Sequence, residues 1–218
     1  NMLNTNAMSE TQCSQALAVG KKYLLHAKEL GCELFIGGDM GIANTSAATV
    51  LASAISGESV AALTGPGTGL DDEGVQRKVA ILEKVLAKHT SEGLSPEKML
   101  QKMGGFEIAA LVGSYIAAAQ RGVIILVDGF ICTAAAMMAI AIAPESRNWM
   151  IFSHGSAEPG HKLMLDYLQV TPVLDLGMRL GEGSGAAVCV PVIQLACKLH
   201  NQMATFAEAA VAGKLDAH

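Results

Sequence analysis

Two glycine-rich runs in the sequence contain side chains that could act on a bound ligand. The first is Gly65-Pro66-Gly67-Thr68-Gly69, and the second is Leu180-Gly181-Glu182-Gly183-Ser184-Gly185. Alternating glycines let backbone N–H groups approach a ligand closely, and a helix that begins behind them favours an anion such as a phosphate. Neither run is G-x-G-x-x-G, and neither ends in the Lys-Ser/Thr pair of a Walker A loop. The two patterns are therefore compatible with phosphate binding and with ordinary tight turns.

Glu182 lies between two of these glycines, where a substrate could approach its carboxylate. Partial desolvation there would raise the pKa of the carboxyl group toward that of a useful general base. The alternative is a solvated turn residue. Asp39 follows two glycines, and Lys78 lies on the helix expected behind the first glycine run. Each of these two side chains could contact a ligand or form an ordinary surface ion pair.

A second cluster of polar residues runs from Ser153 to His161 and contains His154, Ser156 and Glu158. Its spacing matches neither H-E-x-x-H nor G-x-S-x-G, so we expect neither a metal site nor a serine hydrolase. We prefer a loop between a strand and a helix, in which polar side chains bind the amides of the helix terminus.

Asp128 directly follows a buried apolar run. A carboxylate at the end of a buried strand either contacts a ligand or accepts N–H bonds from a neighbouring loop. We favour the second interpretation.

The elements that must position these residues alternate between strand and helix patterns. Short apolar runs at 34–36, 123–127 and 149–152 predict buried strands, and 173–176 supplies another apolar run. Helical spacing is predicted from Ser9 to Gly31, from Asn44 or Thr45 through Ile55, from Asp71 or Asp72 through Leu86, around Met99 and Leu100, from Ile108 to Ala119, after Phe130, from Gly160 to Leu168, and beyond the second glycine run. Strands whose polar, glycine-rich ends lead into helices imply a parallel sheet with a ligand crevice at those ends.

Composition narrows the class of protein. The chain has 218 residues, 51% of them hydrophobic, which suits one α/β domain over residues 1–218. A net charge of −5 without a basic stripe argues against a nucleic-acid partner. The most hydrophobic stretch, 123–143, contains Asp128 and Gly129, so a strand and a helix explain it better than a membrane span.

Cysteine usage and the remaining apolar side chains predict core packing. Five cysteines form no C-x-x-C pair, and no targeting segment is visible at the start of the chain, so we expect reduced thiols in the cytoplasm. We expect core positions for Cys13, Cys32, Cys132, Cys189 and Cys197, for Phe106, Phe130 and Phe206, and for Met137, Met138, Ile140 and Ala141.

Taken in order, five segments resemble the nicotinate-nucleotide–dimethylbenzimidazole phosphoribosyltransferase family: Gly38-Asp39-Met40-Gly41-Ile42-Ala43-Asn44-Thr45, Gly65-Pro66-Gly67-Thr68-Gly69-Leu70-Asp71-Asp72, Val127-Asp128-Gly129-Phe130, Ser156-Ala157-Glu158-Pro159-Gly160-His161, and Leu176-Gly177-Met178-Arg179-Leu180-Gly181-Glu182-Gly183-Ser184-Gly185. Residues 201–209 look like the family's C-terminal helix signature. The resemblance implies a Rossmann-like parallel sheet flanked by helices in three αβα layers, and a homodimer. It implies neither a cofactor nor a metal.

Members of that family transfer the 5-phosphoribosyl group of nicotinate mononucleotide to 5,6-dimethylbenzimidazole, which gives α-ribazole 5′-phosphate and nicotinate. By resemblance, Glu182 is the catalytic base. The resemblance also places Gly41, Gly67, Thr68, Gly69, Lys78 and Ser156 around the nucleotide, Met40 and Leu180 beside the rings, and Asp39, Asp128 and Gly181 among the substrate-binding positions. The family usually has Glu at the position of Asp39 and Gly at that of Ala43.

Family members also have an N-terminal portion that helps to hold the benzimidazole, and nothing in this sequence matches it. We therefore expect the C-terminal, larger part of a longer protein, with the acceptor base left open. The alternatives are a module that binds nicotinate mononucleotide without turnover and a Rossmann oxidoreductase, and the latter lacks the dinucleotide fingerprint.

Overall fold

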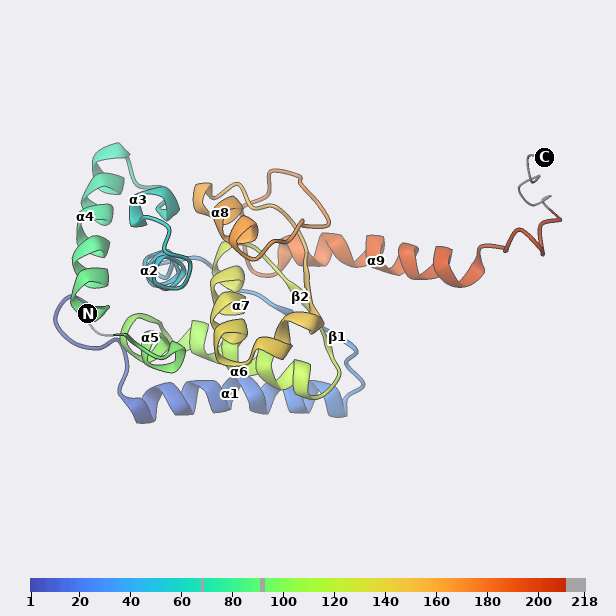
Figure 1. The fold of residues 1–218 in the computed structure, drawn as a ribbon, viewed down its shortest axis with the longest axis horizontal. Helices are drawn as coiled ribbons and strands as arrows, with labels where there is room; N and C mark the ends of the chain where they lie inside the picture. Colours follow the sequence, from blue (N-terminus) through green and yellow to red (C-terminus); the bar gives the residue numbers. More distant parts are fainter. Residues whose placement is uncertain (68, 91–92, 211–218) are drawn as a thin grey trace, which may run out of the picture.

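A computed structural model describes residues 1–67, 69–90 and 93–210. Its sheet has three parallel strands, β1 (Leu34–Gly37), β2 (Ile124–Val127) and β3 (Met150–Phe152), in the order β1-β2-β3. Gly37 pairs with Val127, which in turn pairs with Phe152, so the carboxyl ends of the strands lie together at one edge (Figure 1). The predicted strands are confirmed. The apolar run at 173–176 adds only an isolated bridge between Leu174 and His154.

Helices cover both faces of this sheet. They are α1 (Glu10–Glu29), α2 (Thr45–Ser56), α3 (Val60–Leu63), α4 (Asp72–His89), α5 (Pro96–Met103), α6 (Phe106–Gln120), α7 (Phe130–Ile142), the 3₁₀ helix η1 (Pro144–Trp149), α8 (Pro159–Tyr167) and α9 (Ser184–Gln202). On β2, Leu126 packs with Ala186 and Cys189 of α9, whereas Ile125 and Val127 belong to the main core on the opposite face. Alternation of this kind is the side-chain period of a strand. The predicted three-layer α/β architecture is confirmed.

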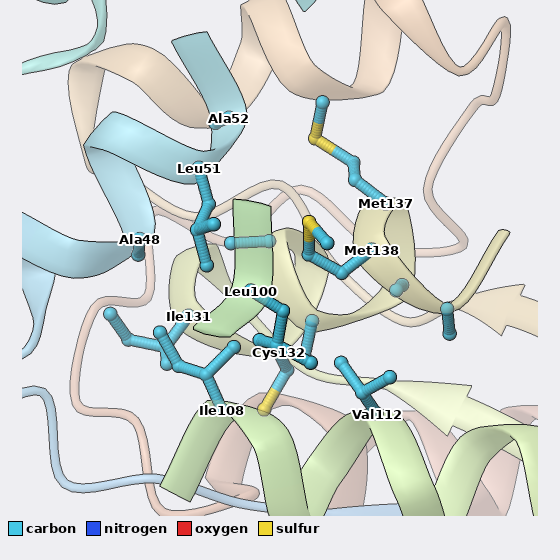
Figure 2. Close-up of a cluster of buried hydrophobic side chains, with 14 of the residues drawn as sticks. Ala48, Leu51, Ala52, Leu100, Ile108, Val112, Ile131, Cys132, Met137 and Met138 are labelled. Atoms are coloured by element: carbon cyan, nitrogen blue, oxygen red, sulfur yellow. The ribbon is translucent and has the colours of Figure 1, made fainter. Parts of the chain in front are cut away.

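The main core lies between α2, α5, α6 and α7 (Figure 2). Leu51, Leu100, Ile108 and Met138 project into it from these four helices, and none of them is exposed to solvent. Small residues let the helices approach closely. A Cβ atom on Gly20 of α1 would lie only 1.8 Å from the carbonyl oxygen of Ala110 on α6, so the backbones of these two helices are in direct contact.

Local signals set most helix starts. Ser9 and Gln12 form the reciprocal capping box of α1, and the Asp71 carboxylate accepts the Gly74 N–H at 2.8 Å. Asn44 occupies the N-cap of α2, but its side chain makes no capping bond there.

Several packing predictions were wrong. Phe106 and Phe206 are 54% and 76% exposed, and Cys197 is exposed as well. Phe106 is the first residue of α6, at the rim of the α1–α6 contact, whereas Cys197 and Phe206 lie beyond the part of α9 that covers the sheet. Figure 1 shows α9 extending away from the other elements, and the helix ends at Gln202 rather than continuing to 209.

The hydrophobic stretch at 123–143 divides into β2 and α7, as predicted. Within the described ranges, no helix is long and apolar enough to cross a membrane.

Candidate active site

A cavity of about 530 Å³ opens at the carboxyl ends of the strands, where the sequence predicted a crevice. Loops that follow each strand contribute to its wall, together with the N-terminus of α2, the first glycine run and the segment before Glu182. The lining residues are Asp39, Met40, Gly41, Thr45, Pro66, Gly67, Gly69, Asp128, Gly129, Phe130, Ile131, Cys132, His154, Ser156, Glu158, Arg179, Leu180 and Gly181.

Nine of the twelve predicted site residues line this cavity: Asp39, Met40, Gly41, Gly67, Gly69, Asp128, Ser156, Leu180 and Gly181. Lys78 lies behind the first glycine run, since its Nζ donates to Thr45 Oγ1 at 2.9 Å and to the Gly65 carbonyl at 3.3 Å. Glu182 directly follows the lining residue Gly181. Thr68 lies outside the described residues.

The loop after β1 is organised by Asp39. One oxygen of its carboxylate accepts the Gly41 N–H at 2.8 Å and a hydrogen bond from the Asn44 side chain. Asn44 therefore binds this loop instead of capping α2. Ala43 has φ 65°, a left-handed conformation that glycine adopts more readily.

Backbone contacts join this loop to the second glycine run. The Glu182 N–H donates to the Asp39 carbonyl at 2.7 Å. A Cβ atom on Gly181 would lie 2.6 Å from that same oxygen, and one on Gly38 would lie 2.6 Å from the Gly183 nitrogen. The glycines at these positions are therefore required for one loop to touch the other.

Glu182 is in an unusual backbone conformation. Gly181, Glu182 and Gly183 have φ values of 81°, 58° and 75°, so three successive residues lie in the left-handed region. For a residue with a side chain this costs about 1 kcal/mol or more, and surrounding contacts must maintain it. The Glu182 side chain is exposed, so the partial desolvation expected from the sequence is not found.

Asp128 and His154 form a buried carboxylate–imidazole pair at the ends of β2 and β3. Their Oδ1 and Nε2 atoms are 3.3 Å apart, and the side chains are only 2% and 4% exposed. Burial raises the pKa of Asp128, but hydrogen bonds from His154 and from backbone amides outweigh it and leave this pKa below its usual value. The bond to Asp128 is the main reason that the pKa of His154 is raised, against the opposing effect of burial. The favoured interpretation of Asp128 as a brace agrees with these contacts.

His161 is the centre of a second buried network. The Ser156 N–H donates to its Nδ1 at 2.8 Å, so that nitrogen carries no proton, and Nε2 is 2.8 Å from Thr133 Oγ1. Burial, followed by repulsion from His154, lowers the pKa of His161 to about 4. A neutral imidazole thus fixes the loop that carries Ser156. The expected role for Glu158 is wrong in part, because this N-cap residue of α8 makes no side-chain capping bond.

Charged side chains lie on the side of the cavity next to the first glycine run. Burial lowers the pKa of Lys78, and the nearby Glu158 carboxylate opposes this effect. Burial raises the pKa of Glu158, whereas Lys78 and Arg179 act in the other direction. Both shifts are consistent with a site that is partly shielded from water, in which an anion would find two cations.

Sequence patterns did not identify Thr45, Ile131, Cys132, His154 or Arg179 as lining residues. Four of them lie within the first residues after a strand or at a helix start, positions that the predicted topology directs to this edge. Arg179 could have been found from its place just before the second glycine run. Among the described residues, no group of three or more His, Cys, Asp or Glu side chains is arranged to hold a metal ion.

Comparison with known proteins supports the resemblance read from the motifs. The model of a family described as "Phosphoribosyltransferase" matches residues 1–211. The chain is 55% identical over 212 residues to the nicotinate-nucleotide–dimethylbenzimidazole phosphoribosyltransferase of Azotobacter vinelandii, covering 97% of this chain and 60% of the relative. It is 53% identical over 214 residues to the protein of that name from Pseudomonas syringae, covering 98% and 61%.

The fold is also similar to that of solved structures. The crystal structure of CobT from Thermus thermophilus superposes with a TM-score of 0.92 at 37% identity, covering 97% of this chain and 63% of that one. This chain therefore spans about three fifths of the length of the relatives that it matches.

Proposed function

Since this chain belongs to the phosphoribosyltransferase family whose model spans residues 1–211, we propose that it carries the nucleotide site of a base-exchanging phosphoribosyltransferase. The reaction moves the 5-phosphoribosyl group of nicotinate mononucleotide to 5,6-dimethylbenzimidazole and yields α-ribazole 5′-phosphate and nicotinate. The observation that carries the proposal is the cavity at the strand ends, where nine of the twelve predicted site residues converge.

The donor would bind with its phosphate on the side of the first glycine run. Gly67 and Gly69 have φ values of 58° and 125°, which turn the backbone sharply beside the Lys78 ammonium group. Backbone amides, a partly buried lysine and Arg179 at the cavity wall suit a phosphate dianion. Ser156 and Gly41 line the same cavity, where they can contact the nucleotide.

The chemistry would require little help for the leaving group. Nicotinate mononucleotide carries a cationic pyridinium, so its glycosidic bond breaks through a state with oxocarbenium character without strong acid assistance. A benzimidazole nitrogen attacks C1′ from the face opposite nicotinate, which inverts β to α. Glu182 accepts the proton from the other ring nitrogen, a contribution worth about 10²- to 10⁴-fold in rate.

Apolar side chains at the cavity mouth would hold the acceptor rings. Met40 is 59% exposed and Leu180 is 71% exposed, and both line the cavity. Leu180 is two residues before Glu182, and Met40 follows Asp39, whose carbonyl accepts the Glu182 N–H. Exposed large apolar side chains at the rim of a polar cavity are typical of a surface that a ligand covers. A planar benzimidazole between them would also shield the Glu182 carboxylate from water.

The test compares Glu182→Gln with the unchanged chain in an assay that separates α-ribazole 5′-phosphate from nicotinate. The amide keeps the size of the side chain but cannot accept the proton, so kcat should fall about 10²- to 10⁴-fold with little change in the KM for nicotinate mononucleotide. Glu83→Gln, at an exposed position of α4, is the matched control. Normal turnover by Glu182→Gln would overturn the role of the base.

A calorimetric titration with nicotinate mononucleotide separates this proposal from the alternative of a binding module. Binding together with product formation supports the enzyme. Binding without product in the unchanged chain would instead favour the module.

We further propose that the protein is a homodimer in the cytoplasm, that residues 1–218 form one domain of a longer protein, and that neither cofactor nor metal takes part. The dimer and the longer protein rest on the family resemblance. The cytoplasm is supported by five cysteines that form no disulfide. Light scattering of the purified protein tests the dimer, because a mass equal to that of one chain would contradict it.

A further inference from the structure

Besides pairing with His154, the Asp128 carboxylate accepts hydrogen bonds from two backbone amides. One carboxylate oxygen accepts the Gly183 N–H at 3.2 Å, and the other accepts the Ala186 N–H at 3.0 Å. These amides belong to the N-cap and the first turn of α9. The N-cap residue is glycine and has no side chain to bind the free amides of that turn, so the carboxylate from the end of β2 takes this role.

His154 fixes the distance between α9 and the sheet. A Cβ atom on Gly185 would lie 2.1 Å from Cδ2 of the imidazole, so the ring occupies the space beside this glycine. Its Nε2 faces Asp128, and its Nδ1 has no hydrogen-bond partner among the described atoms. Asp128 is therefore the group that orients the ring within this part of the structure.

Both contacts act on the loop that carries Glu182. The strained segment Gly181-Glu182-Gly183 is tied at one side to the Asp39 carbonyl through the Glu182 N–H. Its other side is tied to Asp128 through the Gly183 N–H. A left-handed run of this kind persists only where its surroundings fix it, and these two hydrogen bonds are the ties that flank the Glu182 side chain.

We propose that Asp128 and His154 are positioning residues that hold Glu182 at the mouth of the cavity by anchoring Gly183 and the first turn of α9 to the ends of β2 and β3. The pair acts through Glu182 and does not itself touch the reacting atoms. This inference rests on the proposed role of Glu182 as the base.

The decisive experiment is a double-mutant cycle between Asp128→Asn and Glu182→Gln. Asparagine keeps the size of the side chain but lacks the charge and one acceptor. In the presence of Glu182 it should lower kcat by about 10- to 100-fold, as expected when a catalytic group shifts by about 1 Å, with the KM for nicotinate mononucleotide within about twofold. In the Glu182→Gln background the same change should lower the residual rate by less than about twofold.

Additive effects would overturn the inference, because Asp128 would then act on the nucleotide or on the fold as a whole. Gln101→Met is the matched control. Gln101 is also buried, its side chain donates to the Met8 carbonyl at 2.7 Å, and neither residue lines the cavity. Its loss should lower stability without lowering kcat.

The histidine provides a rescue test. His154→Gln retains an N–H donor that can reach Asp128, whereas His154→Phe retains only the ring. Recovery of most of kcat by glutamine and not by phenylalanine supports the hydrogen bond as the positioning contact. Equal loss in the two variants contradicts it.

Hydrogen exchange keeps the inference separate from the proposed function. In the unchanged chain the Gly183 and Ala186 amides should exchange slowly, and Asp128→Asn should speed their exchange about tenfold or more while α6 is unaffected. If the unchanged chain shows no turnover, the proposed function fails, but this exchange measurement still tests the anchor. If exchange is unchanged by Asp128→Asn, the anchor fails whatever the activity.

Discussion

His161 should make the folding stability of the protein fall in mildly acidic solution. Its Nδ1 accepts a backbone N–H from Ser156, and protonation of the imidazole would break this bond within a fully buried site. The pKa is about 4 in the folded protein, compared with 6.5 for a free histidine. Between these values the unfolded chain binds a proton and the folded protein does not. Stability is therefore lost as the pH falls from about 6.5 toward about 4.

The size of the effect follows from the two pKa values. At about pH 5 the unfolded histidine is almost fully protonated, whereas the folded one is about one-tenth protonated, so His161 by itself should lower the free energy of unfolding by about 2 kcal/mol relative to about pH 8. His154 acts in the opposite direction. Because its pKa is raised above 6.5, His154 adds stability as the pH falls through that raised pKa toward 6.5, and it loses this stability as the pH rises again. In the unchanged chain this gain offsets part of the loss due to His161 between about pH 8 and about pH 5.

Urea unfolding at intervals between about pH 8 and about pH 5 measures this dependence in the unchanged chain and in His161→Asn. Asparagine can still accept the Ser156 N–H but cannot titrate. We expect it to be less stable at pH 8, by about 1 to 3 kcal/mol for the lost ring contacts and the bond to Thr133. Its stability should nevertheless fall with pH by about 2 kcal/mol less than that of the unchanged chain.

His26→Asn, on the exposed side of α1, controls for the loss of one imidazole. Parallel pH curves for His161→Asn and the unchanged chain would refute the assignment of a neutral, buried His161.

Three further outcomes follow from packing and burial. Gly20→Ala should lower Tm by about 4 °C or more, because the added Cβ would meet the Ala110 carbonyl and this overpacking outweighs the gain in helix propensity. The control is Ala18→Gly at an exposed position of the same helix, which measures the propensity difference alone. Iodoacetamide should modify the exposed Cys197 readily in the native protein and Cys132 only after unfolding, because burial raises the pKa of Cys132 to about 12. Mass spectrometry of peptides shows which of the two cysteines has been modified. Lys78→Met should raise the Kd for nicotinate mononucleotide about tenfold or more, as measured by calorimetry, whereas the exposed Lys84→Met should leave it unchanged.

Features that depend on a few neighbouring residues were predictable from the sequence. Ser9 caps α1 and Asp71 caps α4 through hydrogen bonds that span three residues, and the apolar run at 123–127 forms the central strand. The convergence of polar loops at one edge follows from parallel strands alone. This topology accounts for Asp39, Met40 and Gly41 after β1, for Asp128 after β2 and for Ser156 after β3. The family resemblance, and not the strands, placed the other four lining residues, which are Gly67, Gly69, Leu180 and Gly181.

Features that depend on distant contacts were not predictable. Asn44 is a good N-cap residue, but its side chain binds Asp39, and only the folded loop brings that acceptor within reach. The pairing of Asp128 with His154 requires the register of β2 against β3, which no local pattern specifies. The exposure of Cys197 depends on how far the sheet extends beneath α9, and the helical pattern of α9 carries no information about that distance.

The two glycine runs show why spacing alone left their role open. Both read G-x-G-x-G, yet their glycines are needed for different reasons. In the second run, side chains at Gly181 and Gly185 would collide with the Asp39 carbonyl and with His154, so these glycines permit one part of the protein to pack against another. In the first run, Gly65 is also closely packed, since its Cβ atom would lie 2.4 Å from Glu158 Oε2. A Cβ atom on Gly69, in contrast, would meet nothing within 4 Å, and the backbone there takes a positive φ. A backbone left accessible in this way, beside Lys78, suits a phosphate. The second run instead packs against the Asp39 loop and against His154, and these contacts hold the backbone of Glu182 in place.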